Sequence, residues 1–223
     1  LFSHTSLLTG RHPSEIASPD YHTYSLPESA LLLPEVLAVY GYHNAAFVGG
    51  GHVKGAYGFK QGFDPYWDDA DFGAFFHTVP RALAWMAEAP RAPFFVFLHG
   101  YDTHRPYLHA GLYHHVFGAD YTGRIDTMLD HSETERIIDG SYYPEFPFQY
   151  FWHAGAGERV LDPSGYARLR EYAATHAGQL LSQADRDHIM AHYDTGALSA
   201  DIQVTRFVEA LEASGAWENT LFA

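Results

Sequence analysis

The chain has 223 residues, 47% of them hydrophobic, which is enough for one α/β domain with a sizeable core or for most of one. Its 13 basic and 27 acidic residues give a formal net charge of -14, which argues against nucleic acid and anionic membrane surfaces as partners. The sequence has no apolar run long enough to span a membrane, and the absence of cysteine excludes disulfides and thiolate metal sites.

The first patterned segment is short and polar. Residues 3–9 are predicted to form a helix that Gly10 closes, because glycine readily takes the left-handed conformation that ends helices. Ser3, or the residue before it, would cap the N-terminus of this helix. The whole segment reads Ser3-His4-Thr5-Ser6-Leu7-Leu8-Thr9-Gly10-Arg11.

Two helix and strand pairs follow. Apolar residues recur at helical spacing over residues 28–40, and residues 43–48 predict a strand that a run of glycines ends. Residues 79–88 predict the next helix, and the continuous apolar run at 93–98 predicts a fully buried central strand. This alternation of helices and strands predicts an α/β fold with a mostly parallel sheet.

The region between the second strand and the last helix has a different composition. Residues 109–163 show no clean period and are rich in tyrosine, histidine, glycine and proline. Long segments of this kind in compact domains are usually functional or disordered. We interpret 108–180 as an insertion or loop layer that faces the substrate over the carboxyl edge of the sheet.

The last helix is predicted to begin near Ser182 and to end at Gly215, with one apolar stripe along its length. His188 and His192 are one turn apart on it, which is a spacing that can bind a metal, but they flank the stripe and we interpret them as a surface pair. Residues 220–223 predict the start of another buried strand.

The first segment resembles the region that follows the nucleophile in sulfatases and related hydrolases of the alkaline phosphatase superfamily. Those enzymes carry the pattern Cys-x-Pro-Ser-Arg-x-x-Leu-Leu-Thr-Gly-Arg, in which Cys or Ser becomes a formylglycine nucleophile. The resemblance places that nucleophile immediately before Leu1, identifies Thr9, Gly10 and Arg11 as the end of the motif, and implies that Ser3 and His4 contact the substrate. It also implies an α/β/α sandwich of the alkaline phosphatase type that extends over residues 1–223.

This segment departs from the family pattern at two positions. Phe2 stands where the family has Pro, and His4 stands where it has Arg. The Pro and Arg are what the formylglycine-generating machinery usually recognises, so the resemblance supports the fold more strongly than it supports formylglycine.

The strand at 43–48 also resembles the family. In many sulfatases this strand ends in Gly-Lys-x-His, whose Lys and His contact the sulfate and the nucleophile. His52 matches the His and is expected to be catalytic, but Gly50 occupies the position of the Lys. Lys54 could supply the missing positive charge from another backbone position, or it could be a solvated loop residue.

The strand at 93–98 runs into a third matching segment. In sulfatases a strand of this kind ends in Asp-x-His-x-Pro-Tyr, and here Asp102 and His104 match the Asp and the His. The resemblance implies that His104 donates a proton or hydrogen bond to a sulfate oxygen or to the leaving group. Asp102 could contact the substrate, orient His104 or brace the turn.

Sulfatases bind one divalent metal, usually calcium, through Asp and Asn or His ligands near the two ends of this region. The resemblance implies that such ligands stand before Leu1 and after Ala223, so that residues 1–223 contain no metal ligand and would not turn over substrate by themselves. It also implies export to the periplasm or the cell exterior.

Three functions are compatible with these observations. The first is hydrolysis of a small-molecule or glycan sulfate ester through a covalent, metal-assisted mechanism. The second is phosphoryl chemistry of the same superfamily, in a phosphodiesterase, phosphonate hydrolase or phosphoglycerol transferase with unmodified Thr or Ser. The third is a non-catalytic module that binds sulfated glycans, and the departures at His4 and Gly50 are its support.

Overall fold

The computed structural model describes residues 2–16, 25–70, 72–88, 93–104, 113–117, 120–122 and 183–223. The chain divides into two compact units. One comprises Leu1–Thr103 together with Ala197–Ala223, and the other comprises His104–Gly196. Most of 108–180 lies outside the described residues, so its role as an insertion stays a prediction.

The first unit contains a parallel sheet. Its strands are β1 (His43–Phe47), β2 (Tyr66–Trp67) and β3 (Phe94–Leu98), in the order β2-β1-β3. β1 pairs in parallel with both neighbours. The two predicted strands are therefore confirmed, but the prediction that the second is central and fully buried is wrong for the described sheet. β1 is central and is buried at all positions except His43, whereas β3 is half-buried throughout.

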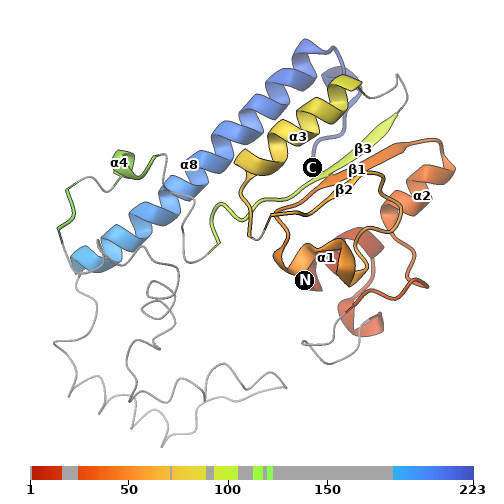
Figure 1. Ribbon diagram of the computed structural model, residues 1–223, viewed down its shortest axis with the longest axis horizontal. Helices are drawn as coiled ribbons and strands as arrows, with labels where there is room; N and C mark the ends of the chain where they lie inside the picture. Colours follow the sequence, from red (N-terminus) through yellow and green to blue (C-terminus); the bar gives the residue numbers. More distant parts are fainter. Residues whose placement is uncertain are drawn as a thin grey trace, which may run out of the picture. The chain divides into compact units, whose positions relative to one another are not determined.

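Helices cover both faces of this sheet (Figure 1). Helices α1 (Phe2–Thr9) and α2 (Leu33–Val39) lie on one face. Helix α3 (Phe75–Glu88) and the C-terminal half of α8 (Gln183–Ala213) lie on the other. Side chains alternate along β1 accordingly, because Ala46 packs in the first cluster and Ala45 and Phe47 pack in the second. The predicted α/β architecture with helices on both faces is confirmed.

Helices α2 and α3 both differ in length from the prediction, and proline explains the difference for α2. Residues 28–32 are not helical, and α2 begins at Leu33 because Pro34 is best tolerated in the first turn of a helix. The Leu32 N–H donates to the Glu35 carboxylate at 2.8 Å, which satisfies one exposed backbone donor at the helix start. In contrast, α3 begins at Phe75, four residues earlier than predicted, and accommodates Pro80 in its interior.

The buried face of α8 differs from the predicted stripe. Phe207 and Leu211 pack against the sheet as expected. In the preceding turns most buried side chains are polar, with Ala191 as a buried apolar one, and Tyr193 of the predicted stripe is exposed. The interpretation of His188 and His192 as a surface pair is wrong, because both are buried. The polar buried side chains of α8 are Asp185, His188, His192, Thr195, Ser199 and Gln203.

The remaining described elements are short. Residues 220–223 form no strand, contrary to the prediction, and Leu221 is 92% exposed. None of the helices in the described part of the chain has the length and apolar character that crossing a membrane requires. The other elements are the 3-10 turns η1 (Pro13–Glu15), η2 (Gly51–Val53), η3 (Gly55–Tyr57) and η6 (Trp217–Asn219) and the short helix α4 (His114–Phe117).

Candidate functional site

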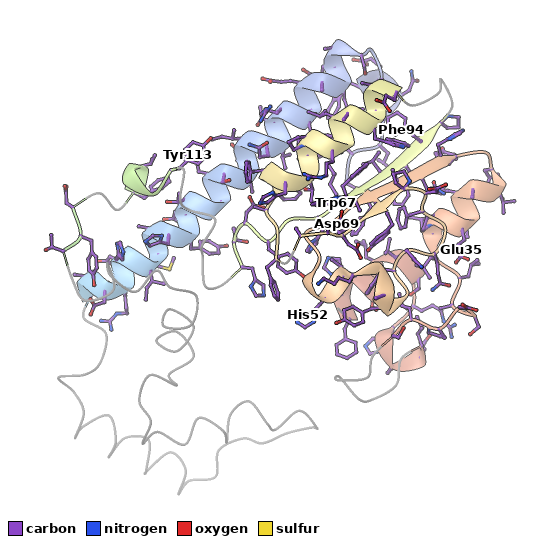
Figure 2. The ribbon with its side chains drawn as sticks, in the orientation of Figure 1. Glu35, His52, Trp67, Asp69, Phe94 and Tyr113 are labelled. Atoms are coloured by element: carbon purple, nitrogen blue, oxygen red, sulfur yellow. The ribbon has the colours of Figure 1, made fainter. Side chains whose placement is uncertain are left out.

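Three loops meet at the carboxyl edge of the sheet, which is where ligands bind in parallel α/β sheets. The loop after β1 carries the glycines and His52, which Figure 2 labels. The loop after β2 begins with Asp68, and the loop after β3 carries His99 and Tyr101. Backbone hydrogen bonds connect the loops, from Gly73 N to Gly49 O at 2.8 Å and from Tyr101 N to Gly73 O at 3.0 Å.

The glycines after β1 allow these loops to approach each other. A Cβ on Gly49 would lie 2.1 Å from the Gly73 carbonyl oxygen, and one on Gly50 would lie 1.8 Å from the Ala70 carbonyl oxygen. Gly50 also has φ 75° and ψ -132°, a conformation that only glycine adopts readily. The backbone at position 50 therefore has no room for any side chain, including the lysine that the resemblance would place there.

Three side chains hold the loop that carries His52. The hydroxyl of Tyr101 accepts the His52 N–H at 3.0 Å and donates to the Gly50 carbonyl at 3.2 Å. Tyr66 donates its hydroxyl to the Val53 carbonyl at 2.5 Å, and Asp68 accepts the Gly55 N–H at 2.7 Å. Burial, with the charges of Asp68 and Tyr101 nearby, raises the pKa of Tyr66, so its hydroxyl keeps the proton that it donates.

Aromatic contacts connect His4 of α1 to the same edge. The His4 ring lies edge-on to His99, with 4.8 Å between ring centroids, and His99 lies edge-on to Tyr101 at 4.7 Å. Tyr101 in turn bonds the backbone of His52. A chain of contacts through His99 and Tyr101 therefore links His4 to the backbone of His52, and both are predicted site residues.

The carboxylate of Asp102 supports the helix that follows β2. Asp102 is 2% exposed, and one of its oxygens accepts the Phe75 N–H at 2.8 Å, where α3 begins. Gly100 makes room for this carboxylate, because a Cβ there would lie 2.5 Å from the same oxygen. This hydrogen bond braces the turn after β3, which was one of the roles predicted for Asp102. Contact with substrate stays a prediction.

The remaining residues of the first motif end α1. Gly10 has φ 66° and donates its N–H to the Ser6 carbonyl, and the Thr9 hydroxyl donates to the Thr5 carbonyl at 2.7 Å. Arg11 forms an exposed ion pair with Glu15 at 3.3 Å. Ser3 is exposed, and its hydroxyl lies 3.3 Å from the His4 Nδ1.

Lys54 and His104 have different settings. Lys54 is half-buried and connects η2 to η3, two residues after His52. His104 is exposed and is the first residue of the second unit, two residues after Asp102. Their substrate-binding and catalytic roles stay predictions.

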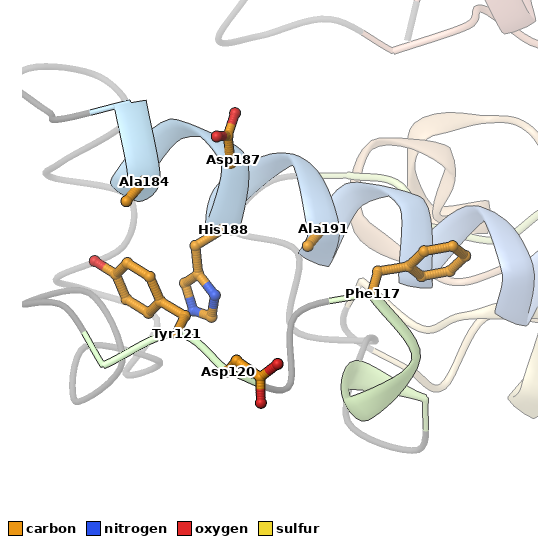
Figure 3. Close-up of a pocket in the computed structure, with 7 residues that line it drawn as sticks. All are labelled: Phe117, Asp120, Tyr121, Ala184, Asp187, His188 and Ala191. Atoms are coloured by element: carbon orange, nitrogen blue, oxygen red, sulfur yellow. The ribbon is translucent and has the colours of Figure 1, made fainter.

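The second unit contains a pocket of its own (Figure 3). The ring of Tyr121 stacks on His188 at a centroid distance of 3.9 Å and an angle of 13°, and the Tyr121 hydroxyl donates to Asp185. The Nε2 atoms of His188 and His192 are 3.1 Å apart. These contacts fix the orientation of His188 at the pocket wall. The pocket is lined by Phe117, Asp120, Tyr121, Ala184, Asp187, His188 and Ala191.

The described residues offer no fit for the calcium ion that the resemblance implies. Within these parts of the chain, no three His, Cys, Asp or Glu side chains are grouped so that they could hold a metal ion. Asp68 and Asp102 stand at the carboxyl edge, but each accepts a backbone N–H of the chain itself.

A parallel sheet between two layers of helices, with histidines gathered at its carboxyl edge, defines an α/β protein whose candidate site lies at the strand ends. The family model described as Sulfatase matches residues 3–223, which is nearly the whole chain. The chain belongs to the sulfatase family.

A solved structure gives the same fold. The chain is similar to BT4656, whose structure was determined in complex with its substrate D-glucosamine-2-N,6-O-disulfate, with 18% sequence identity and a TM-score of 0.59. The match covers 98% of this chain and 53% of that chain, so the chain spans about half the length of that structure. At this identity the likeness shows the fold alone. No curated protein matches the chain in sequence.

Sequence reasoning missed Tyr101 and Tyr66 and gave little weight to His99. The signal for Tyr101 and His99 was their place directly after a strand, where side chains reach the carboxyl edge of a parallel sheet. No sequence pattern indicates the role of Tyr66, because its hydroxyl bonds the Val53 carbonyl of another loop, and that contact forms only in the folded chain.

We expect Gly50→Ala to lower the free energy of unfolding by about 3 kcal/mol, because a Cβ adds a backbone clash to the unfavourable left-handed conformation. Gly41→Ala is the matched control, since Gly41 has φ 82° but open space around it, and it should lose only about 1 kcal/mol. Urea unfolding followed by circular dichroism measures both. Equal losses would contradict the close packing of Gly50 against Ala70.

Burial lowers the pKa of His4, so the unfolded chain binds this proton more tightly than the folded one. The contribution of His4 to stability is therefore complete above about pH 6.5 and is lost as the pH falls. Between about pH 7 and about pH 5, the wild-type protein should lose more unfolding free energy than His4→Gln. The exposed His43 provides the control variant His43→Gln, which should behave like wild type. Identical pH dependence of wild type and His4→Gln would contradict this assignment.

Proposed function

We propose that the protein is a hydrolase of sulfate esters whose substrate binds at the carboxyl edge of the β1 and β3 strands. The observation that carries this proposal is the family match over residues 3–223, together with the contacts at that edge that link the His4 ring, through His99 and Tyr101, to the backbone of His52. The substrate class is a small-molecule or glycan sulfate ester, and the sulfated glucosamine bound by BT4656 is one candidate.

In this mechanism the nucleophile stands just before Leu1, at the N-terminal end of α1, where the helix dipole and the backbone N–H groups of the first turn favour an anionic substrate. His52 donates a hydrogen bond to an oxygen of the sulfate group as negative charge develops on it. His4, whose pKa is lowered, is neutral near pH 7 and acts as an N–H donor rather than as a cation. His104 protonates the leaving group.

Binding an anion requires local positive charge, because the net charge of -14 repels it at long range. We assign this role to Lys54, in place of the family's lysine at the position of Gly50. A divalent cation, calcium in the family, belongs to this proposal with ligands outside the described residues. It would supply Lewis-acid activation of the ester when bound.

The reaction class is tested with an aryl sulfate and the matching aryl phosphodiester, using protein purified from its own host so that any modification before Leu1 is retained. We expect hydrolysis of the sulfate, and a loss of about 100-fold in kcat/KM for His52→Gln. The control is His43→Gln, at the amino end of the same strand, which should retain full activity.

Two outcomes of this assay would favour the alternatives. Preferential turnover of the phosphodiester would favour a phosphodiesterase, phosphonate hydrolase or phosphoglycerol transferase. No turnover of either ester, together with binding of D-glucosamine-2-N,6-O-disulfate, would favour a non-catalytic glycan-binding module.

We expect Lys54→Met to raise KM for the sulfate ester about tenfold, because it removes the charge assigned to substrate binding. The exposed Lys60 gives the control Lys60→Met, which lowers the net charge equally and should leave KM unchanged. Steady-state kinetics at fixed ionic strength measure both variants. Unchanged kinetics of Lys54→Met would remove Lys54 from the site.

A further inference from the structure

We propose that Tyr101 is the positioning residue for His52, and that its hydroxyl fixes the turn from which the imidazole reaches the substrate. This inference rests on the proposed function, in which His52 stabilises the charge that develops on the sulfate group. It assigns to Tyr101 no contact with the substrate.

The hydroxyl of Tyr101 makes two bonds to the loop after β1. It accepts the His52 N–H at 3.0 Å and donates its own proton to the Gly50 carbonyl at 3.2 Å. A phenol has one O–H donor and lone pairs on the same oxygen, so both bonds form together. One side chain from the loop after β3 therefore fixes the backbone on both sides of Gly51.

The loop after β1 needs such support because of its sequence. Three glycines, at positions 49–51, precede His52, and glycine loses more conformational freedom on ordering than any other residue. The His52 side chain is itself exposed. On the far side of His52, Val53 is buried and its carbonyl accepts the hydroxyl of Tyr66. Residues on either side of His52 are thus anchored, while its own N–H is held by Tyr101.

The ring of Tyr101 fixes where the hydroxyl lies. Tyr101 is 8% exposed, and its ring lies edge-on to Phe72 at 5.0 Å and to His99 at 4.7 Å. Gly51 leaves the space that the hydroxyl occupies, because a Cβ there would lie 2.5 Å from the hydroxyl oxygen. Phenylalanine at this position keeps the ring contacts and removes only the two hydrogen bonds, so Tyr101→Phe tests the hydroxyl directly.

The kinetic test uses Tyr101→Phe, His52→Gln and the double variant with the aryl sulfate. We expect Tyr101→Phe to lower kcat about tenfold and to change KM less than about twofold, since misplacement of His52 affects the transition state more than ground-state binding. In the His52→Gln background the same substitution should cause no further loss, because Tyr101 acts through His52. The exposed Tyr57 of η3 gives the control Tyr57→Phe, which should leave kcat unchanged.

A second measurement does not depend on activity. Hydrogen exchange of the His52 amide, measured by NMR, should be about tenfold faster in Tyr101→Phe, while the Gly55 amide, which Asp68 holds, should exchange at its wild-type rate. An unchanged kcat, losses that multiply in the double variant, or unchanged exchange of the His52 amide would each overturn the inference. Full activity of His52→Gln would instead refute the proposed role of His52, which separates failure of the proposed function from failure of the positioning role.

Discussion

The close approach of backbone to backbone at the end of β1 is the constraint on which the site depends. Gly49 and Gly50 pack against the carbonyl groups of Gly73 and Ala70 at distances that no side chain permits. This packing brings the loops after all three strands together and creates the space for the Tyr101 hydroxyl. The interaction is local, but it decides where His52 stands and why position 50 carries no charge.

This constraint alters the electrostatics of the site relative to the family pattern. Gly50 and His4 stand at positions where the family has Lys and Arg, so two permanent charges are replaced by one neutral backbone and one titratable ring. Burial lowers the pKa of His4, which favours the neutral ring with a single N–H donor near neutral pH. The proposed site therefore combines directed N–H donors with the local positive charge assigned to Lys54. Hydrogen-bond donors stabilise a developing charge well only if their positions are fixed. The two hydrogen bonds of the Tyr101 hydroxyl matter because they fix the backbone at His52.

Local patterns in the sequence predicted the parts of the fold that local physics decides. Apolar runs predicted the strands β1 and β3. Gly10 and Gly41, which have positive φ, indicated the C-terminal ends of α1 and α2. The predicted helix over 28–40 starts too early, because it places Pro34 in the helix interior, whereas α2 begins at Leu33 with Pro34 in its first turn. The face that α8 buries was also misjudged, since burial of polar side chains there depends on contacts that periodicity cannot reveal. In the candidate site, motifs point to His4 and His52, whose roles stay predictions. No motif points to Tyr101, because its hydrogen bond to the His52 N–H forms only when residues 49 positions apart in the sequence are brought together.

The charge of the chain also bears on which ester the site would accept. A sulfate monoester carries one negative charge, whereas a phosphate monoester carries about two near neutral pH. The field of a protein with net charge -14 repels the dianion more strongly, and neutral donors such as His4 offset that repulsion less than fixed cations would. Phosphodiesters and phosphonate monoesters carry a single charge, as sulfate esters do. The negative net charge therefore disfavours phosphate monoesters relative to these three classes of ester. Among the three monoanionic classes, the nucleophile and the loops that contact the rest of the substrate would determine which ester is hydrolysed.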